Sequence, residues 1–138
     1  MNYLRITVFL IAKKSNIDAK DIHEQTCLHL AASQGLTEMC HCLLEFGALI
    51  NLRDISCWNA LHHAVDGNYY DTATLLIKRG IDINAEDHKY GRTSLHIASE
   101  KGYNKIANML IIRGANISMS GNYYYYNYYC YYYYYYYV

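Results

Sequence analysis

The 138-residue sequence lacks proline and has no excess of charge of either sign. The missing proline excludes proline-rich linkers and ligands. Twelve basic residues cancel twelve acidic ones, which argues against the charged surface of a nucleic-acid or anionic-membrane binder. Residues 4–12, LRITVFLIA, are the only long apolar run, and they are too few to cross a bilayer. Arg5 also interrupts the unbroken apolar stretch that a signal peptide needs. We expect neither nucleic acid nor membrane as a partner.

Cysteine is present in an odd number, which does not suggest a disulfide framework. A body of this size can bury a core without covalent staples. We expect reduced thiols in an intracellular protein, in the cytoplasm rather than the nucleus. A zinc site is not expected, because Cys40 and Cys42 would point about 200° apart on a helix and no C-x₂-C pair exists. No cofactor is expected either. The five cysteines are Cys27, Cys40, Cys42, Cys57 and Cys130.

Tyrosine is concentrated in one place, since 13 of the 18 tyrosines lie in residues 122–138. Only Asn127 and Cys130 interrupt the run between Tyr123 and Tyr137. The composition is that of an aggregation-prone segment. We interpret the tail as a reiterated tract without a dedicated role. The alternatives are a makeshift cap on the preceding repeat, a kinase substrate, or a tail that drives self-association of an otherwise monomeric chain.

An internal repeat organises the rest of the chain. His29 and His62 are 33 residues apart, and His96 follows 34 residues later. In each unit an alanine-containing apolar stripe at helical spacing predicts a short helix. A residue that tolerates positive φ follows it, and a second amphipathic helix ends at a glycine twelve residues further on. These paired positions are 35 and 47, 68 and 80, and 102 and 114.

These residues resemble the ankyrin repeat, which carries a Thr-Pro-Leu-His turn, an alanine pair, Gly, a Leu-Leu pair and Gly-Ala. The resemblance covers about residues 4–121 and implies an all-α ankyrin-repeat solenoid, built from helix-turn-helix units with β-hairpin finger loops. The expected divisions are a partial repeat at 1–20 that has only the second helix, three repeats at 21–53, 54–86 and 87–121, and the tail at 122–138.

The sequence departs from the family pattern at the start of each unit. Cys27, Ala60 and Ser94 stand where the family usually has proline, so the helix starts lose preorganisation. Glu24 and Cys57 replace the usual turn glycine, and only Gly91 keeps it. We therefore expect the array to be less stable than a consensus one.

Enzymatic chemistry is not expected from these residues. The resemblance implies that His29, His62 and His96 hydrogen-bond neighbouring turns instead of acting as bases or ligands. The sequence has no phosphate-binding glycine loop, no G-x-S-x-G and no HExxH. The carboxylates of Asp66, Asp71 and Glu100 show no pairing in the sequence. We predict a non-enzymatic module.

The resemblance implies that the chain binds another protein through its finger loops and its concave face. Trp58 is the leading candidate, since exposed loop aromatics are frequent hot spots; the alternative is that its ring packs locally on its own finger. Trp58→Ala is expected to weaken binding by about 2 kcal/mol or more while the protein stays helical. Second-rank candidates from the first helices are Ser33, Gln34, Asp66, Glu100 and Lys101. The predicted contact residues are Ile22, His23, Gln25, Ile55, Ser56, Trp58, His88, Lys89, Tyr90 and Arg92.

A second functional hypothesis concerns the context of the array. The chain is then a fragment of a larger ankyrin-containing protein, in which the repeats are a regulatory or scaffolding segment. The sequence does not identify the partner under either hypothesis.

Overall fold

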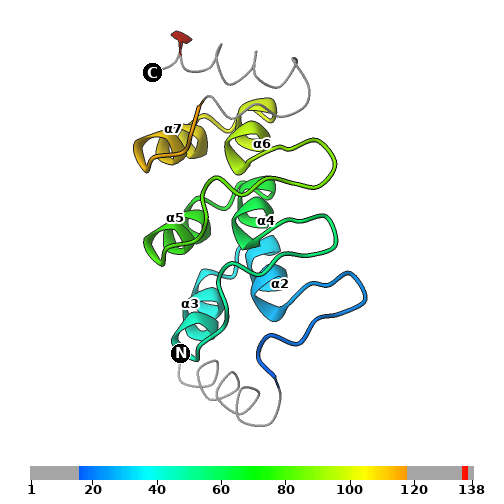
Figure 1. Cartoon of the computed structure of the whole chain (residues 1–138). Helices are drawn as coiled ribbons and strands as arrows, with labels where there is room; N and C mark the ends of the chain where they lie inside the picture. Colours follow the sequence, from blue (N-terminus) through cyan, green and yellow to red (C-terminus); the bar gives the residue numbers. More distant parts are fainter. Residues whose placement is uncertain (1–15, 118–134, 137–138) are drawn as a thin grey trace.

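The computed structural model describes residues 16–117 together with residues 135 and 136. Residues 16–117 form three helix pairs that stack one above another (Figure 1). Within each pair the first helix has seven residues and the second has nine. The helices are α2 (Cys27–Ser33), α3 (Thr37–Glu45), α4 (Ala60–Asp66), α5 (Tyr70–Lys78), α6 (Ser94–Glu100) and α7 (Asn104–Ile112).

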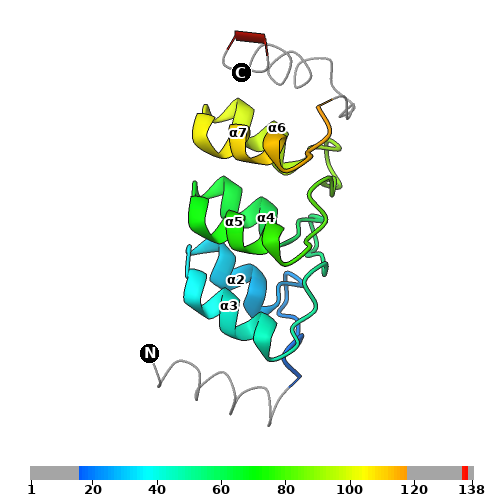
Figure 2. The same cartoon turned by 90° about the vertical axis from the view of Figure 1, so that its left-hand side faces the viewer.

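The packing is that of a solenoid, in which each helix contacts its partner and the equivalent helix of the next pair. The first helices α2, α4 and α6 form one column, and α3, α5 and α7 form the other (Figure 2). No strand occurs in residues 16–117. The predicted all-α repeat solenoid is therefore confirmed, and the long loops between pairs project from one side of the stack (Figure 1).

The first helix of each pair begins directly after a buried polar residue. Thr26, Asn59 and Thr93 hold extended backbone there and act as N-caps. The backbone amide of Thr26 donates to Nδ1 of His29 at 3.1 Å, and the same pattern recurs in the other two pairs. Since a side chain three residues along satisfies an amide at the helix start, these helices begin without the proline that the family usually places there.

The residues that follow the helices at the six paired positions have the backbone conformation that the sequence predicts. Each lies at positive φ, a region that glycine adopts without steric cost and asparagine tolerates. Asn68, the one non-glycine among them, has φ 60°. The other five are Gly35, Gly47, Gly80, Gly102 and Gly114.

Two of the repeat histidines, His29 and His62, hydrogen-bond the loop that follows their helix pair, as expected. Nε2 of His29 donates to the carbonyl oxygen of Leu52 at 3.0 Å, which fixes Nδ1 as the acceptor from Thr26. Nε2 of His62 reaches the carbonyl oxygen of Arg92 at 3.3 Å in the same way. Burial lowers the pKa of His29 and lowers that of His62 to about 4. Both rings are therefore neutral structural donors at neutral pH.

The two cysteines of α3 fill the core, in agreement with the sequence. Cys40 is fully buried and Cys42 is nearly so, among the apolar residues that the helix pairs share. Burial raises the pKa of the Cys40 thiol to about 12. The thiol is therefore protonated at neutral pH and behaves as a small apolar side chain.

Three expectations lie outside the described residues. These are the second helix expected in the partial repeat at 1–20, the end of the third repeat at 118–121, and most of the tyrosine tail. Of that tail the structure describes Tyr135 and Tyr136, which are exposed. The repeat boundaries themselves stay predictions. Among the described helices none is long and apolar enough to cross a membrane.

Candidate functional site

The three loops that precede α2, α4 and α6 are each built around an aspartate, at Asp21, Asp54 and Asp87. We call these loops finger 1 (residues 21–25), finger 2 (residues 54–58) and finger 3 (residues 87–92). In finger 2, Oδ1 of Asp54 accepts the backbone amides of Ser56 and Trp58, both at 2.9 Å. Asp21 and Asp87 accept two amides of their own fingers in the same manner. The repeated aspartate thus determines the path of each finger.

The fingers are hydrogen-bonded turns, so the expectation of β-hairpins is not met within residues 16–117. In finger 2 the backbone amide of Asp54 donates to the carbonyl of Trp58, and that bond closes the loop. The next amides inward donate to the aspartate side chain instead of to an opposite strand. A strand ladder therefore does not form.

Neighbouring fingers are joined by one backbone hydrogen bond at each step. The amide of Ile55 donates to the carbonyl of His23 at 3.1 Å, and the amide of His88 donates to that of Ser56 at 3.0 Å. The fingers therefore form a continuous row along one side of the stack (Figure 1).

Fingers 2 and 3 differ in the donor that binds the second carboxylate oxygen of their aspartate. Oδ2 of Asp54 accepts from Nε2 of His63 at 2.8 Å, whereas Oδ2 of Asp87 accepts from Nε of Arg92 at 2.9 Å. Burial by itself raises the pKa of each carboxyl, but the hydrogen bonds outweigh it and the net pKa is lowered. Both aspartates are therefore anionic anchors at neutral pH.

In fingers 1 and 2 the turn residue that replaces glycine has a strained backbone conformation. Glu24 has φ 58° and Cys57 has φ 59°, while Gly91 in finger 3 has φ 65°. Side chains adopt this left-handed region at a cost of about 1–2 kcal/mol. The substitutions noted in the sequence therefore destabilise the fingers themselves.

Fingers 2 and 3 enclose a groove of about 550 Å³, which we call the finger groove. Six of the ten predicted contact residues line it, and the structure adds Asp87 to them. The lining is mixed: aliphatic and aromatic on the side of finger 2, and charged on the side of finger 3. The lining residues are Ile55, Ser56, Trp58, Asp87, His88, Lys89 and Arg92.

The other predicted contact residues lie beside the finger groove. Ile22 on finger 1 is 89% exposed and Ile55 on finger 2 is 62% exposed, at equivalent positions of linked fingers. The ring of Tyr90 lies under the Lys89 ammonium at 4.8 Å. His23 is exposed and Gln25 is half-buried on finger 1. An apolar strip on fingers 1 and 2 thus continues into the finger groove.

Trp58 is half-buried, with its ring against α4. It stacks on His62 at 5.7 Å between ring centroids and meets the edge of His63 at 5.1 Å. These ring contacts are with α4, whereas the alternative of local packing placed the ring on its own finger. Trp58 also lines the finger groove.

The first helices, which were expected to line a concave face, bring two predicted residues together. Nζ of Lys101 on the α6 side lies 2.7 Å from Oδ1 of Asp66 on α4. Glu100 likewise lies 3.3 Å from Arg92. Asp66 and Glu100 therefore form ion pairs with basic side chains that lie elsewhere in the sequence, contacts that the sequence did not predict. Ser33 is half-buried and Gln34 exposed on the same face.

Sequence reasoning missed the anchoring roles of Asp54, Asp87 and His63. The sequence does contain a pattern that indicates the role of the aspartates, because one aspartate recurs at the start of every finger. We used that pattern only to align the repeats. His63 gave no signal, because Leu30 and Ile97 occupy its place in the other repeats. In the described part of the chain, no group of histidine, cysteine or carboxylate side chains is arranged to hold a metal ion.

Family models agree with this architecture. A model of ankyrin repeats in three copies matches residues 1–87, and a single ankyrin-repeat model matches residues 90–122.

The chain is also similar to parts of much longer proteins. It is 33% identical over 108 residues to the nuclear factor NF-kappa-B p105 subunit of Gallus gallus, covering 76% of this chain and 11% of that one. It is 33% identical over 104 residues to the B-cell lymphoma 3 protein homolog of Mus musculus, covering 72% and 23%. It is 34% identical over 100 residues to the human ankyrin repeat and KH domain-containing protein 1, covering 72% and 4%. The chain therefore spans at most a quarter of these relatives.

Proposed function

Because the chain belongs to the ankyrin-repeat family, whose repeats are protein-interaction modules, we propose that it binds its partner protein through the finger groove. The concave face beside the groove adds secondary contacts. The whole site is then formed by two fingers and the first helices behind them.

The observation that carries this proposal is the gathering of predicted contact residues in one groove. Three of these residues come from finger 2 and three from finger 3, yet all six line the same groove. They are Ile55, Ser56, Trp58, His88, Lys89 and Arg92. The carboxylates of Asp54 and Asp87 hold both fingers in place without a partner. A preorganised surface loses little conformational entropy on binding, which favours affinity.

The composition of the surface supports a protein as the ligand. Ile22 and Ile55 expose aliphatic side chains to solvent at the finger tips, and adjacent exposed apolar groups commonly mark interaction sites. Lys89 and Arg92 border them. Protein interfaces typically combine an apolar centre with a polar rim, and this surface has both components. The zero net charge of the sequence makes nucleic acid a poor alternative.

A second candidate function is a regulatory or scaffolding role of the array within a larger protein. The small share of each relative that the chain spans favours it. The same finger groove would then serve an intramolecular contact or a scaffolding partner.

We further propose that binding is the only activity of the array and that the protein is intracellular. The first rests on the family, which is generally non-enzymatic. The second rests on the thiols, since the four described cysteines are free. Cell fractionation of a tagged chain tests the location, and recovery from the secreted fraction would contradict it.

Affinity capture with two matched variants tests the binding surface. Ile55→Asp introduces a charge into the lining of the finger groove. Ile112→Asp introduces it at an 81% exposed isoleucine of α7, a helix of the column that lies away from the fingers (Figure 1). We expect Ile55→Asp to lose the captured partner and Ile112→Asp to retain it. Equal retention by both variants would contradict the proposal.

A further inference from the structure

Finger 3 is one residue longer than the other two fingers. In finger 2 the amide of Asp54 donates to the carbonyl of Trp58, four residues on. In finger 3 the amide of Asp87 donates to the carbonyl of Arg92, five residues on. Finger 1 closes over four residues, like finger 2. The added residue therefore lies in the loop of finger 3, between the two residues that close it.

Hydrogen bonds and backbone conformation match the residues of finger 3 to those of finger 2 one by one. Equivalent residues donate to the carbonyl of the preceding finger, donate to the aspartate of their own finger, or have positive φ. Lys89 has no counterpart in this matching, so it is the added residue. The matched pairs are Ile55 with His88, Ser56 with Tyr90, Cys57 with Gly91, and Trp58 with Arg92.

The matched pairs give the finger groove two chemically different sides. Finger 2 contributes Ile55 and Trp58 to the lining, and their counterparts in finger 3 are His88 and Arg92. The added Lys89 is exposed and lines the groove as well. Loops accept insertions without loss of the fold and often carry function. This insertion adds a basic side chain to the side of the groove that is already polar.

The carboxylates near finger 3 contact Arg92 at the base of the finger. Oδ2 of Asp87 accepts from Nε of Arg92 at 2.9 Å, and Glu100 accepts from Nη1 of the same side chain at 3.3 Å. These two carboxylates offset the guanidinium charge. Lys89 is in the tip, with its ammonium 4.8 Å from the centroid of the Tyr90 ring. The tip of finger 3 thus adds a cation to the groove beyond the ion pairs at its base.

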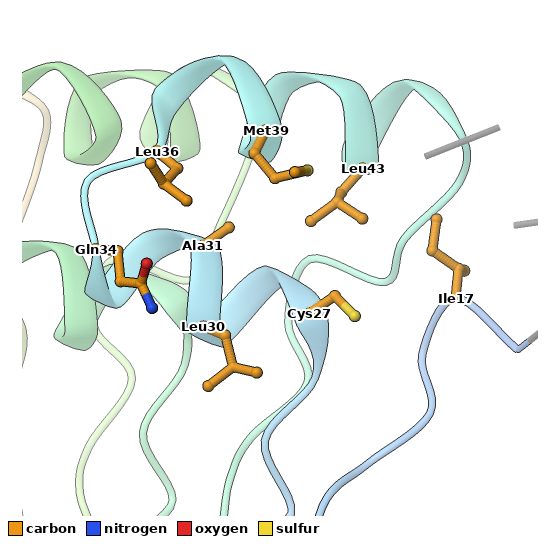
Figure 3. Close-up of a pocket in the computed structure, with 8 residues that line it drawn as sticks. All are labelled: Ile17, Cys27, Leu30, Ala31, Gln34, Leu36, Met39 and Leu43. Carbon is orange, nitrogen blue, oxygen red and sulfur yellow. The ribbon is translucent and has the colours of Figure 1, made fainter. Parts of the chain in front are cut away.

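A second groove, between α2 and α3, lacks this combination of apolar and charged sides (Figure 3). It encloses about 220 Å³, and none of its lining side chains is charged. Such a surface does not discriminate between acidic and basic ligands, whereas the finger groove can. The lining residues of this second groove are Ile17, Cys27, Leu30, Ala31, Gln34, Leu36, Met39 and Leu43.

The step between fingers restricts the conformation of a ligand that contacts both. Equivalent positions of adjacent repeats are separated by about 10 Å, the distance between packed helices. In a polyproline II segment, side chains three positions apart lie on the same side and about 9 Å from each other. That spacing matches one step. An α-helix is about 10–12 Å wide with its side chains, which is too wide to enter between two fingers.

We propose that the finger groove takes an extended segment of the partner protein that carries an aliphatic residue and, three positions away, an acidic residue. This inference rests on the function proposed above. The aliphatic side chain packs on Ile55 and Trp58, and the carboxylate pairs with Lys89. Ile22 of finger 1, which is 89% exposed, accepts a second aliphatic residue one step further. Apolar contacts then supply affinity, while Lys89 determines specificity by rejecting basic side chains.

Peptide selection on the full chain tests this chemistry. A phage-displayed library of random dodecapeptides is selected on the wild type, on Lys89→Glu and on Lys78→Glu. Lys78 is the matched control because it is an exposed lysine at the end of α5, in the column away from the fingers (Figure 1). Both variants change the net charge by the same amount, so a general electrostatic effect would appear in both.

We expect the wild type to enrich peptides in which aspartate or glutamate lies three positions from leucine, isoleucine or valine. Lys78→Glu should select the same pattern, whereas Lys89→Glu should replace the acidic residue by lysine or arginine. A peptide selected on the wild type should bind Lys89→Glu about tenfold more weakly, because an attraction becomes a repulsion.

An acidic preference that persists in Lys89→Glu would overturn the inference. A spacing of about seven positions, which corresponds to one side of a helix, would overturn it too. Ile55→Asp separates this failure from that of the proposed function. Peptides that lose binding to Ile55→Asp but show no acidic preference would overturn the inference alone. Peptides that bind Ile55→Asp as well as the wild type, or no enrichment at all, would contradict the proposed function also.

Discussion

Nε2 of His63 lies 2.8 Å from Oδ2 of Asp54, and this contact attaches finger 2 to the helix behind it. The same carboxylate holds the amides of the finger through its other oxygen. The Trp58 ring lies across both His62 and His63. A substitution in α4 can therefore alter the finger groove through its contacts with the Asp54 carboxylate and the Trp58 ring.

We predict that His63→Leu lowers the free energy of unfolding by about 1–3 kcal/mol, because it leaves the buried Oδ2 of Asp54 without its donor. Leucine is compatible with this place in a helix, since Leu30 occupies it in α2. Urea denaturation measures the effect. His41→Leu, at an exposed histidine of α3, is the control and should change stability by less than about 0.5 kcal/mol. Equal effects would show that the contact contributes nothing specific.

The fold is expected to lose stability between pH 6.5 and pH 4. Burial lowers the pKa of His62 from 6.5 to about 4, so the unfolded chain takes up a proton in this interval that the folded chain resists. The linked loss is about 3 kcal/mol by pH 4. His29 adds to it in the same direction. The measurement is the urea midpoint as a function of pH.

The variant His62→Gln should make that pH profile flatter, because it removes the titrating group. The lowered pKa values of Asp54 and Asp87 act in a different interval. Their contribution is complete above the ordinary aspartate pKa near 4 and is lost as the pH falls through their lowered values. A profile that His62→Gln leaves unchanged would assign the acid sensitivity to other groups.

Cys57→Gly is expected to stabilise the protein by up to about 1 kcal/mol. Cys57 has φ 59°, and glycine removes the steric cost of that conformation while adding some unfolded-state entropy. Thermal unfolding measures the change. Cys57→Ala removes the thiol but keeps the strain, so it should not stabilise. A gain of the same size in both variants would attribute the effect to the thiol.

The sequence predicted the helix pairs because each is determined locally. Three of these local features can be read from the sequence itself: the apolar spacing, a threonine or asparagine before the first helix of each pair, and the twelve residues between the positive-φ positions. The buried cysteines of α3 and the linking role of His29 also followed from their repeat positions. These features depend on residues a few positions apart or on one repeat length.

The predictions failed where a side chain interacts outside its repeat pattern. The pairing of Asp66 with Lys101 joins residues 35 positions apart, a separation that helical spacing does not suggest. The hairpin expectation failed because the finger amides bind an aspartate side chain instead of an opposite strand. Trp58 could be assigned to a finger, but its packing on His62 and His63 depends on the fold of that finger.

The most direct test of the central claim is a binding titration of the captured partner against wild-type chain and Trp58→Ala. Far-ultraviolet circular dichroism must first show that the variant remains helical at the titration temperature. We predict that its Kd is about thirtyfold weaker or more, equivalent to about 2 kcal/mol. A Kd equal to that of the wild type would contradict recognition through the finger groove.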